Sequence, residues 1–108
     1  MGEAIRDEII TILEGELGDP RIGLVSVTEV QMSPDGRSAR IFVNVEGDED
    51  EALRTMEGLL NARSYIRREL GSNLRLRQAP ELHFHLDRSN VYSSRIEELL
   101  SRIKKKRR

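Results

Sequence analysis

Hydrophobic residues near the start of the chain recur at intervals of three and four, which is the period of a helix with one apolar face. Five positions make up this stripe: Ile5, Ile9, Ile12, Leu13 and Leu17. Gly18 and Pro20 follow it, and both residue types commonly mark the end of a helix. The pattern predicts a helix over residues 3–17 and a turn over residues 19–21.

The next apolar residues belong to two runs with the composition of β-strands, at residues 24–31 and 38–45. The sequence Ser-Pro-Asp-Gly lies between them at residues 33–36. It is a strong turn signal, because proline presets one backbone angle and glycine accepts a positive φ. We therefore predict that the two strands form a hairpin.

Helical spacing returns after the second predicted strand. Asp48 is the expected N-cap, and Glu51, three residues on, completes a capping-box pattern. The apolar stripe then runs over residues 53–70, and Gly71 is the predicted stop. Because this run is long for a small domain, we expect a kink or a break near residues 61–64.

The last part of the chain predicts one more strand and one more helix. Leu82, Phe84 and Leu86 alternate with polar residues, which indicates a third strand with one apolar face. Ser94 and Glu97 match a capping box at the start of a final helix. The apolar stripe of that helix comprises Ile96, Leu99, Leu100 and Ile103.

Together these elements follow the order α-β-β-α-α-β-α, which predicts an α+β fold with helices covering one face of a small sheet. The helical pair separates the second and third strands, so the third strand should join the sheet through a crossover connection. A chain of 108 residues can build one modest core. We expect residues 1–103 to form a single domain and residues 104–108 to form a disordered basic tail.

Composition removes several classes of function. The chain contains no cysteine, which excludes disulfides, thiol catalysis and thiolate metal sites and fits a reducing compartment. It has no apolar run long enough to span a membrane, and its N-terminus does not resemble a signal peptide. We expect a soluble, cytoplasmic protein.

The near-neutral total charge conceals a division between two halves of the chain. Residues 1–61 carry five Lys/Arg against fourteen Asp/Glu, a formal −9, and residues 62–108 carry thirteen against five, a formal +8. A basic half attracts polyanions, and an acidic half beside it discourages indiscriminate binding. Nucleic acid is therefore the first partner that the sequence suggests.

Six arginines of the basic half are the candidate RNA-binding residues: Arg63, Arg67, Arg68, Arg75, Arg77 and Arg88. The first three lie opposite an apolar helical stripe, and the next two alternate with leucines, so their side chains should face solvent. A guanidinium suits phosphate because its planar fork donates two hydrogen bonds at once. The alternative is an ordinary solvated face, but Glu69 is the only acid within residues 62–80.

Other chemistry has weaker support in the sequence. His83 and His85 are the only histidines, and a solvated or partner-facing strand surface explains them better than a metal site does. Gly15 and Gly18 form a GxxG pattern like the loop with which KH domains clamp RNA, but it closes an acidic helix, and we reject it. No catalytic motif appears, and four aromatic residues are too few to favour base stacking on a sheet. We expect no enzyme activity, no metal and no cofactor, and contacts mainly to phosphates.

Four motifs are specific enough to point to a known family. They are Gly-Asp-Pro-Arg-Ile-Gly at residues 18–23, the hairpin with Ser33 and Ala39, Tyr-Ile-Arg-Arg-Glu-Leu-Gly at residues 65–71, and Leu-Arg-Gln-Ala-Pro-Glu-Leu-His-Phe at residues 76–84. Through them, the chain from about Ala4 to Ile103 resembles bacterial ribosome-binding factor A.

The resemblance implies a type II KH-like fold in the order α-β-β-α-kink-α-β, with a further C-terminal helix and without the GxxG loop. It places the interhelical kink at Ala62 to Ser64, where serine stands at the family's glycine position. The kink is expected to survive through hydrogen bonding of the serine to the backbone.

The resemblance also implies a non-enzymatic assembly factor that binds the small ribosomal subunit and its RNA. It implies a role in late subunit maturation, in processing the 5′ end of that RNA and in growth at low temperature. We expect a monomer that uses no small-molecule substrate. An alternative from another class stays open: a protein-interaction module whose acidic half recruits a basic partner.

Overall fold

The computed structural model of this protein describes residues 2–16 and 25–106. The elements within those ranges are α1 (Gly2–Thr11), the π-helical turn η1 (Ile12–Glu16), β1 (Val25–Met32), β2 (Ser38–Val45), α2 (Glu49–Asn73), β3 (Glu81–Leu86) and α3 (Ser93–Lys106). α1 and η1 together cover most of the first predicted helix. Its predicted end at Gly18, the turn at residues 19–21 and the tail residues 107–108 lie outside the described residues.

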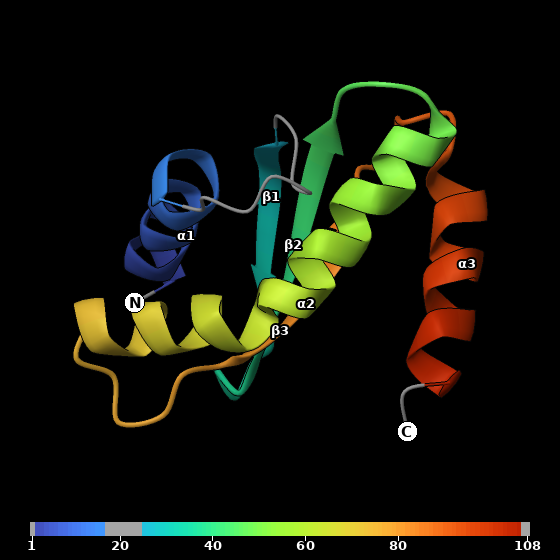
Figure 1. The fold of residues 1–108 in the computed structure, drawn as a ribbon. Helices are drawn as coiled ribbons and strands as arrows, with labels where there is room; N and C mark the ends of the chain where they lie inside the picture. The colour runs from blue at the N-terminus through green and yellow to red at the C-terminus, as the bar shows by residue number, and fades with distance from the viewer. Residues whose placement is uncertain (1, 17–24, 107–108) are drawn as a thin grey trace.

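The three strands form one mixed sheet in the order β1-β2-β3 (Figure 1). β1 and β2 are antiparallel and are joined by the turn predicted at residues 33–36, where Gly36 has a φ of +71°. β3 is parallel to β2, with Phe84 opposite Ile41, so α2 is the crossover connection between them. The predicted hairpin and the predicted crossover are both confirmed.

A bulge in β1 takes Thr28 out of the regular strand pairing. The register shifts between Val27 and Glu29, and this is where the strand carries its extra residue. The Thr28 hydroxyl donates to Oδ2 of Asp87 at 2.6 Å and lies 3.2 Å from the carbonyl oxygen of Phe42. The bulge thereby connects β1 to the residue that follows β3.

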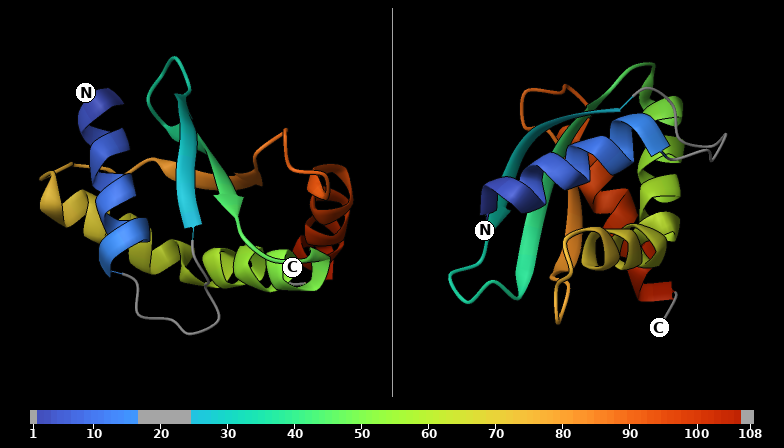
Figure 2. Two further views of the ribbon diagram at one scale, coloured as in Figure 1. Left: turned by 90° about the horizontal axis from the view of Figure 1, so that it is seen from above. Right: turned by 90° about the vertical axis from the view of Figure 1, so that its left-hand side faces the viewer.

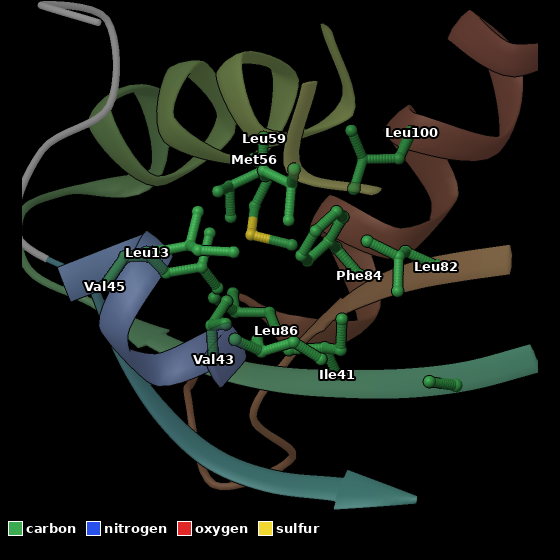
Figure 3. Close-up of a cluster of buried hydrophobic side chains, with 14 of the residues drawn as sticks. Leu13, Ile41, Val43, Val45, Met56, Leu59, Leu82, Phe84, Leu86 and Leu100 are labelled. Carbon is green, nitrogen blue, oxygen red and sulfur yellow. The ribbon is translucent and has the colours of Figure 1, made fainter. Parts of the chain in front are cut away.

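One face of the sheet and all three helices enclose the hydrophobic core. Figure 2 shows α2 lying along the sheet, with α1 and α3 near opposite ends of α2. Leu82, Phe84 and Leu86 point from β3 into this core, as their alternation predicts (Figure 3). The helices contribute buried side chains that include Ile5, Ile9, Ile12, Ala52, Met56, Leu59, Ile66, Leu70, Ile96 and Leu100.

The N-terminus of α2 has the predicted capping box. The Glu51 N–H donates to Oδ1 of Asp48 at 2.9 Å, and the Asp48 N–H donates to Oε1 of Glu51 at 3.2 Å. Gly47 precedes the cap with a φ of +110°, and a Cβ at that position would lie 2.8 Å from Cβ of Glu51. Both the backbone angle and the space therefore require glycine at this entry to the helix.

α2 is one continuous, bent helix where the sequence predicts two helical segments. It runs without interruption from Glu49 to Asn73, so the observed element order is α-β-β-α-β-α. The helix changes direction in its middle (Figure 1), and the assignment of that bend to Ala62 and Ser64 stays a prediction. No proline or glycine occurs within residues 61–64, so every backbone N–H there can continue the helical hydrogen bonding.

The predicted helix stop at Gly71 is wrong, because Arg75 provides the left-handed residue that ends α2. Arg75 has a φ of +54°. Its N–H donates to the carbonyl oxygen of Ser72 at 3.3 Å, and the Leu76 N–H donates to that of Gly71 at 2.9 Å. These are the paired bonds of a Schellman motif, whose left-handed position is usually a glycine. Gly71 stays inside the helix, where an added Cβ would lie 3.6 Å from Cβ of Ala79.

α3 confirms the predicted final helix but not its predicted capping box. The helix begins at Ser93, so Ser94 already lies inside it. The carboxylate of Glu97 does not turn back to the helix start, and its Oε1 lies 3.1 Å from Nδ1 of His85. α3 continues to Lys106 and therefore includes the lysines of the predicted basic tail.

Candidate nucleic-acid interface

The second half of α2 and the loop over residues 74–80 enclose an open groove of about 470 Å³. Spacings of three and four place the residues of its helical wall on one side of α2. The lining residues are Ser64, Arg67, Arg68, Gly71 and Ser72 from the helix and Leu76 and Ala79 from the loop. The lining of the groove therefore combines guanidinium groups and hydroxyls with a small apolar area.

Arg67 holds the two walls of this groove together. Its Nε and Nη2 both donate to the carbonyl oxygen of Ala79, at 3.2 and 2.9 Å. A lysine could not place two donors in this fixed fork. The remaining terminal nitrogen, Nη1, makes no hydrogen bond to the part of the chain that the structure describes, and the side chain is exposed. Arg67 is thus a structural tie that keeps donors available for an anion.

Arg68 lies beside an exposed aromatic ring. Its Cζ is 5.9 Å from the centroid of the Tyr65 ring, one helical turn earlier, which is within the range of a cation–π contact. Tyr65 is 39% exposed and is one of two large apolar or aromatic residues exposed in the described structure. The groove thus has, on its helical wall, a guanidinium next to an aromatic ring.

The loop after α2 presents its arginines as the alternation predicts. Leu74 and Leu76 are half-buried and pack against the core, whereas Arg75 and Arg77 are exposed. The left-handed conformation of Arg75 turns the chain away from the helix axis at this point. Four of the six predicted arginines are therefore found on the walls of the groove or on the loop that forms one of them.

The other two predicted arginines lie elsewhere. Arg63 is half-buried and lines a narrow crevice together with His83 and Leu100. Arg88 lies with its Cζ 5.5 Å from the ring centroid of Phe42, on the side of the sheet opposite α2. Arg67 and Arg68 thus line the groove, and Arg75 and Arg77 lie on the loop that forms its other wall. Arg63 lines a different crevice, and Arg88 lies on the other side of the sheet.

The sheet face opposite α2 carries a cluster that the sequence reasoning did not identify. The rings of Phe42 and His85 are 5.4 Å apart and close to parallel, and Arg88 covers the phenyl ring. A shallow groove of about 350 Å³ passes over them and is also lined by Arg40 and Glu97. The sequence contained a signal for this cluster, because strand alternation and the pairing of β2 with β3 put Arg40 and Phe42 on the same face as His83 and His85.

Asp87, next to this cluster, is held in its ionised form. Hydrogen bonds from the Ser89 hydroxyl and the Thr28 hydroxyl, each 2.6 Å long, lower the pKa of Asp87 to about 2, with a further contribution from the Ser89 N–H. The carboxylate is therefore charged at neutral pH and orders the turn between β3 and α3.

The acidic segment before α2 has local partners. Asp48 and Glu51 form the capping box, and Glu49 makes an ion pair with Arg95 of α3. Acidic side chains in a first helical turn also interact favourably with the helix dipole. Most of the acidic residues of this segment thus have a structural role at the N-terminus of α2.

The described residues, 2–16 and 25–106, show neither a metal site nor a membrane span. No group of three or more His, Cys, Asp or Glu in those ranges is arranged to hold a metal ion. His83 instead lies 3.8 Å from a carboxylate oxygen of Glu81. Within the same part of the chain, no helix is both long enough and apolar enough to cross a membrane.

Sequence comparison places the chain among known proteins. The family model described as ribosome-binding factor A matches residues 1–100. Ribosome-binding factor A of Koribacter versatilis is 56% identical over 108 residues, which is 100% of this chain and 88% of the relative. The matched region therefore spans the groove, the loop over residues 74–80 and the sheet face opposite α2.

Solved structures agree with this relationship. The crystal structure of ribosome-binding factor A from Thermus thermophilus matches with a TM-score of 0.65 and 28% identity, over 83% of this chain and 99% of that one. A homology model of the Thermus thermophilus factor, fitted into a cryo-EM map of its 30S complex, matches with a TM-score of 0.58 and 29% identity, over 78% of this chain and 91% of that one. The predicted KH-like α+β fold is thereby confirmed. With a family match over residues 1–100 and close relatives along its whole length, the chain belongs to the ribosome-binding factor A family.

Proposed function

We propose that this protein is a non-enzymatic, cytoplasmic assembly factor that binds the small ribosomal subunit through its ribosomal RNA. It acts late in subunit maturation, assists processing of the RNA 5′ end and supports growth at low temperature. The observation that carries the proposal is family membership over nearly the whole chain, together with the 30S complex into which a similar structure has been fitted.

The groove of α2 is the main RNA contact in this proposal. Arg67 and Arg68 line it, and Arg75 and Arg77 are exposed on the loop that forms its other wall. A guanidinium that is already held by the protein loses less freedom when it binds a phosphate. Arg63 and Arg88, which do not line the groove, are further contacts in this proposal. The acidic segment at residues 48–51 repels RNA and limits binding to the basic side.

This contact predicts a steep dependence of binding on salt. About five phosphate contacts correspond to a log–log slope of affinity against salt of roughly −3 to −5. Removing one contacting arginine should reduce that slope by about 1. The slope is measured from the affinity for purified small subunits over a series of potassium chloride concentrations.

A pair of charge reversals tests the proposed surface. Arg68→Glu with Arg77→Glu should abolish co-sedimentation with small subunits, because two attractive contacts become repulsive. Arg67 is left unchanged in this variant, since it also holds the carbonyl oxygen of Ala79. The proposed surface is wrong if the double variant, folded by circular dichroism, still co-sediments at wild-type affinity.

The matched control reverses two exposed arginines outside the groove. Arg37→Glu with Arg54→Glu makes the same change in net charge on the acidic half of the chain. This control should retain most of the binding to small subunits. Equal losses in both double variants would indicate that net charge alone governs binding, without a specific surface.

The alternative, an acidic docking module for a basic partner, has less support. Asp48, Glu49 and Glu51 already have partners within the protein. Asp50 lies in the same turn, so Asp50→Lys tests docking while leaving the capping box in place. The RNA-binding proposal predicts binding to small subunits at least as tight as that of the wild type, whereas loss of binding would favour the docking module.

A further inference from the structure

The groove contains more than is needed to hold a phosphate. Its wall at Gly71, Leu76 and Ala79 is apolar and contains no charge. The groove has a volume of about 470 Å³ and is open to solvent along much of its length, so a ligand in it would keep one side exposed. A bare phosphate contact does not require an apolar wall, so the groove has the form of a surface site for a flat, partly apolar group.

Arg68 and Tyr65 provide a surface on which a base could stack, on the helical side of the groove. Arg68 lines the groove, and the Tyr65 ring lies against its guanidinium group. Arginine guanidinium planes and aromatic rings are the surfaces on which unpaired RNA bases stack. The hydroxyls of Ser64 and Ser72 lie on the same helical wall and can bond a ribose or a base edge.

We propose that this groove binds one unpaired nucleotide of RNA. The base stacks on Arg68, the sugar lies against Leu76 and Ala79, and the phosphate accepts hydrogen bonds from the free donors of Arg67. A paired base cannot enter, because both of its faces are covered by neighbours in the duplex. This inference rests on the proposed function and adds selectivity for single-stranded RNA to it.

A variant that fills the groove without changing any charge tests the proposal. Ser72→Leu places a larger side chain on the helical wall, at an exposed position where leucine favours the helix. We expect it to weaken binding to fluorescently labelled short oligo(U) and oligo(A) by at least about tenfold, or about 1.4 kcal/mol. The matched control, Ser101→Leu, adds the same side chain at an exposed position of α3 and should bind these oligonucleotides like the wild type.

A second variant separates stacking from charge. Arg68→Lys keeps the positive charge but removes the planar guanidinium. It should weaken binding to the single-stranded oligonucleotides by severalfold and leave both the salt slope and the affinity for an RNA duplex of equal length unchanged. Unchanged binding of both RNAs would show that Arg68 acts only as a charge. Equal losses for single-stranded and duplex RNA would show that its guanidinium contacts phosphates and does not stack on a base.

The outcomes distinguish failure of this inference from failure of the proposed function. If Ser72→Leu, with a wild-type melting temperature, binds the oligonucleotides like the wild type, the nucleotide site is refuted. The same holds if the wild type does not prefer single-stranded RNA to the duplex. In either case the proposed function stands when Arg68→Glu with Arg77→Glu still abolishes binding to small subunits, and it falls when that double variant binds normally.

Discussion

Arg67 of α2 donates two hydrogen bonds to the carbonyl oxygen of Ala79, 12 residues later in the chain. These bonds join the helix to the loop over residues 74–80 and fix the position of the loop relative to the helix. A residue that the sequence assigns to phosphate binding is thus also a structural tie. The two roles can be separated by experiment, because the bond uses Nε and Nη2 and leaves Nη1 available.

Arg67→Ala should loosen the loop over residues 74–80. Loss of the two hydrogen bonds should lower the free energy of unfolding by about 0.5–1.5 kcal/mol, a modest figure because the side chain is exposed. Urea denaturation measures this change, and hydrogen exchange should show faster exchange of the loop amides. Arg68→Ala is the control and should change stability by less than about 0.5 kcal/mol. Wild-type exchange rates in the loop of Arg67→Ala would contradict the role assigned to this tie.

Arg75→Gly should make the protein more stable while weakening RNA binding. Arg75 adopts a φ of +54°, and relief of the steric conflict between its Cβ and the backbone should raise the free energy of unfolding by about 1 kcal/mol. Arg75→Ala is the matched control, since it removes the same charge but keeps the Cβ and should give no such gain. Both variants should reduce the salt slope of binding by about 1. If both variants gain the same stability, the gain does not come from relief of backbone strain at residue 75.

The entry to α2 should be sensitive to single substitutions. Asp48→Ala should lower the free energy of unfolding by about 1 kcal/mol, because the Glu51 N–H loses its acceptor. Gly47→Ala should destabilise as well, since the added Cβ would lie 2.8 Å from Cβ of Glu51 at a φ of +110°. Thermal and urea denaturation check both, with Asp50→Ala as a neighbouring substitution that leaves the cap intact. An Asp48→Ala protein as stable as Asp50→Ala would rule out a significant contribution from the capping box.

Asp87 should make stability depend on pH in acid. The folded-state pKa of about 2 lies below the ordinary value of 3.8, so the carboxylate stabilises the fold above about pH 4. That contribution should decline as the pH falls from about 4 towards 2. Thr28→Val removes one of the two hydroxyl donors and should raise the pKa of Asp87, as measured by NMR titration of the carboxyl carbon. An unchanged pKa in Thr28→Val would show that the bond across the β1 bulge does not hold this carboxylate.

Local sequence was sufficient to predict most of the elements of the fold. The Ser-Pro-Asp-Gly turn, the Asp48–Glu51 capping box and the alternation around Phe84 each act within a few residues, so their structures follow from neighbouring side chains. The end of α2 was mispredicted for the opposite reason. Gly71 matches a helix stop locally, but α2 continues through it to Asn73, and Arg75 takes the left-handed position instead.

The sequence by itself determined that this protein has one basic half with outward-facing arginines, and an α+β fold in which a crossover joins the third strand. Only the tertiary structure decided which arginines share a surface. Arg67 and Arg68 meet the loop of Ala79 because the core packs α2 against β3, whereas Arg88 lies over Phe42 on the other side of the sheet. Charge and periodicity are properties of neighbouring residues. A groove instead requires two separate segments of the chain to be held at a fixed distance, and packing of the core provides that constraint.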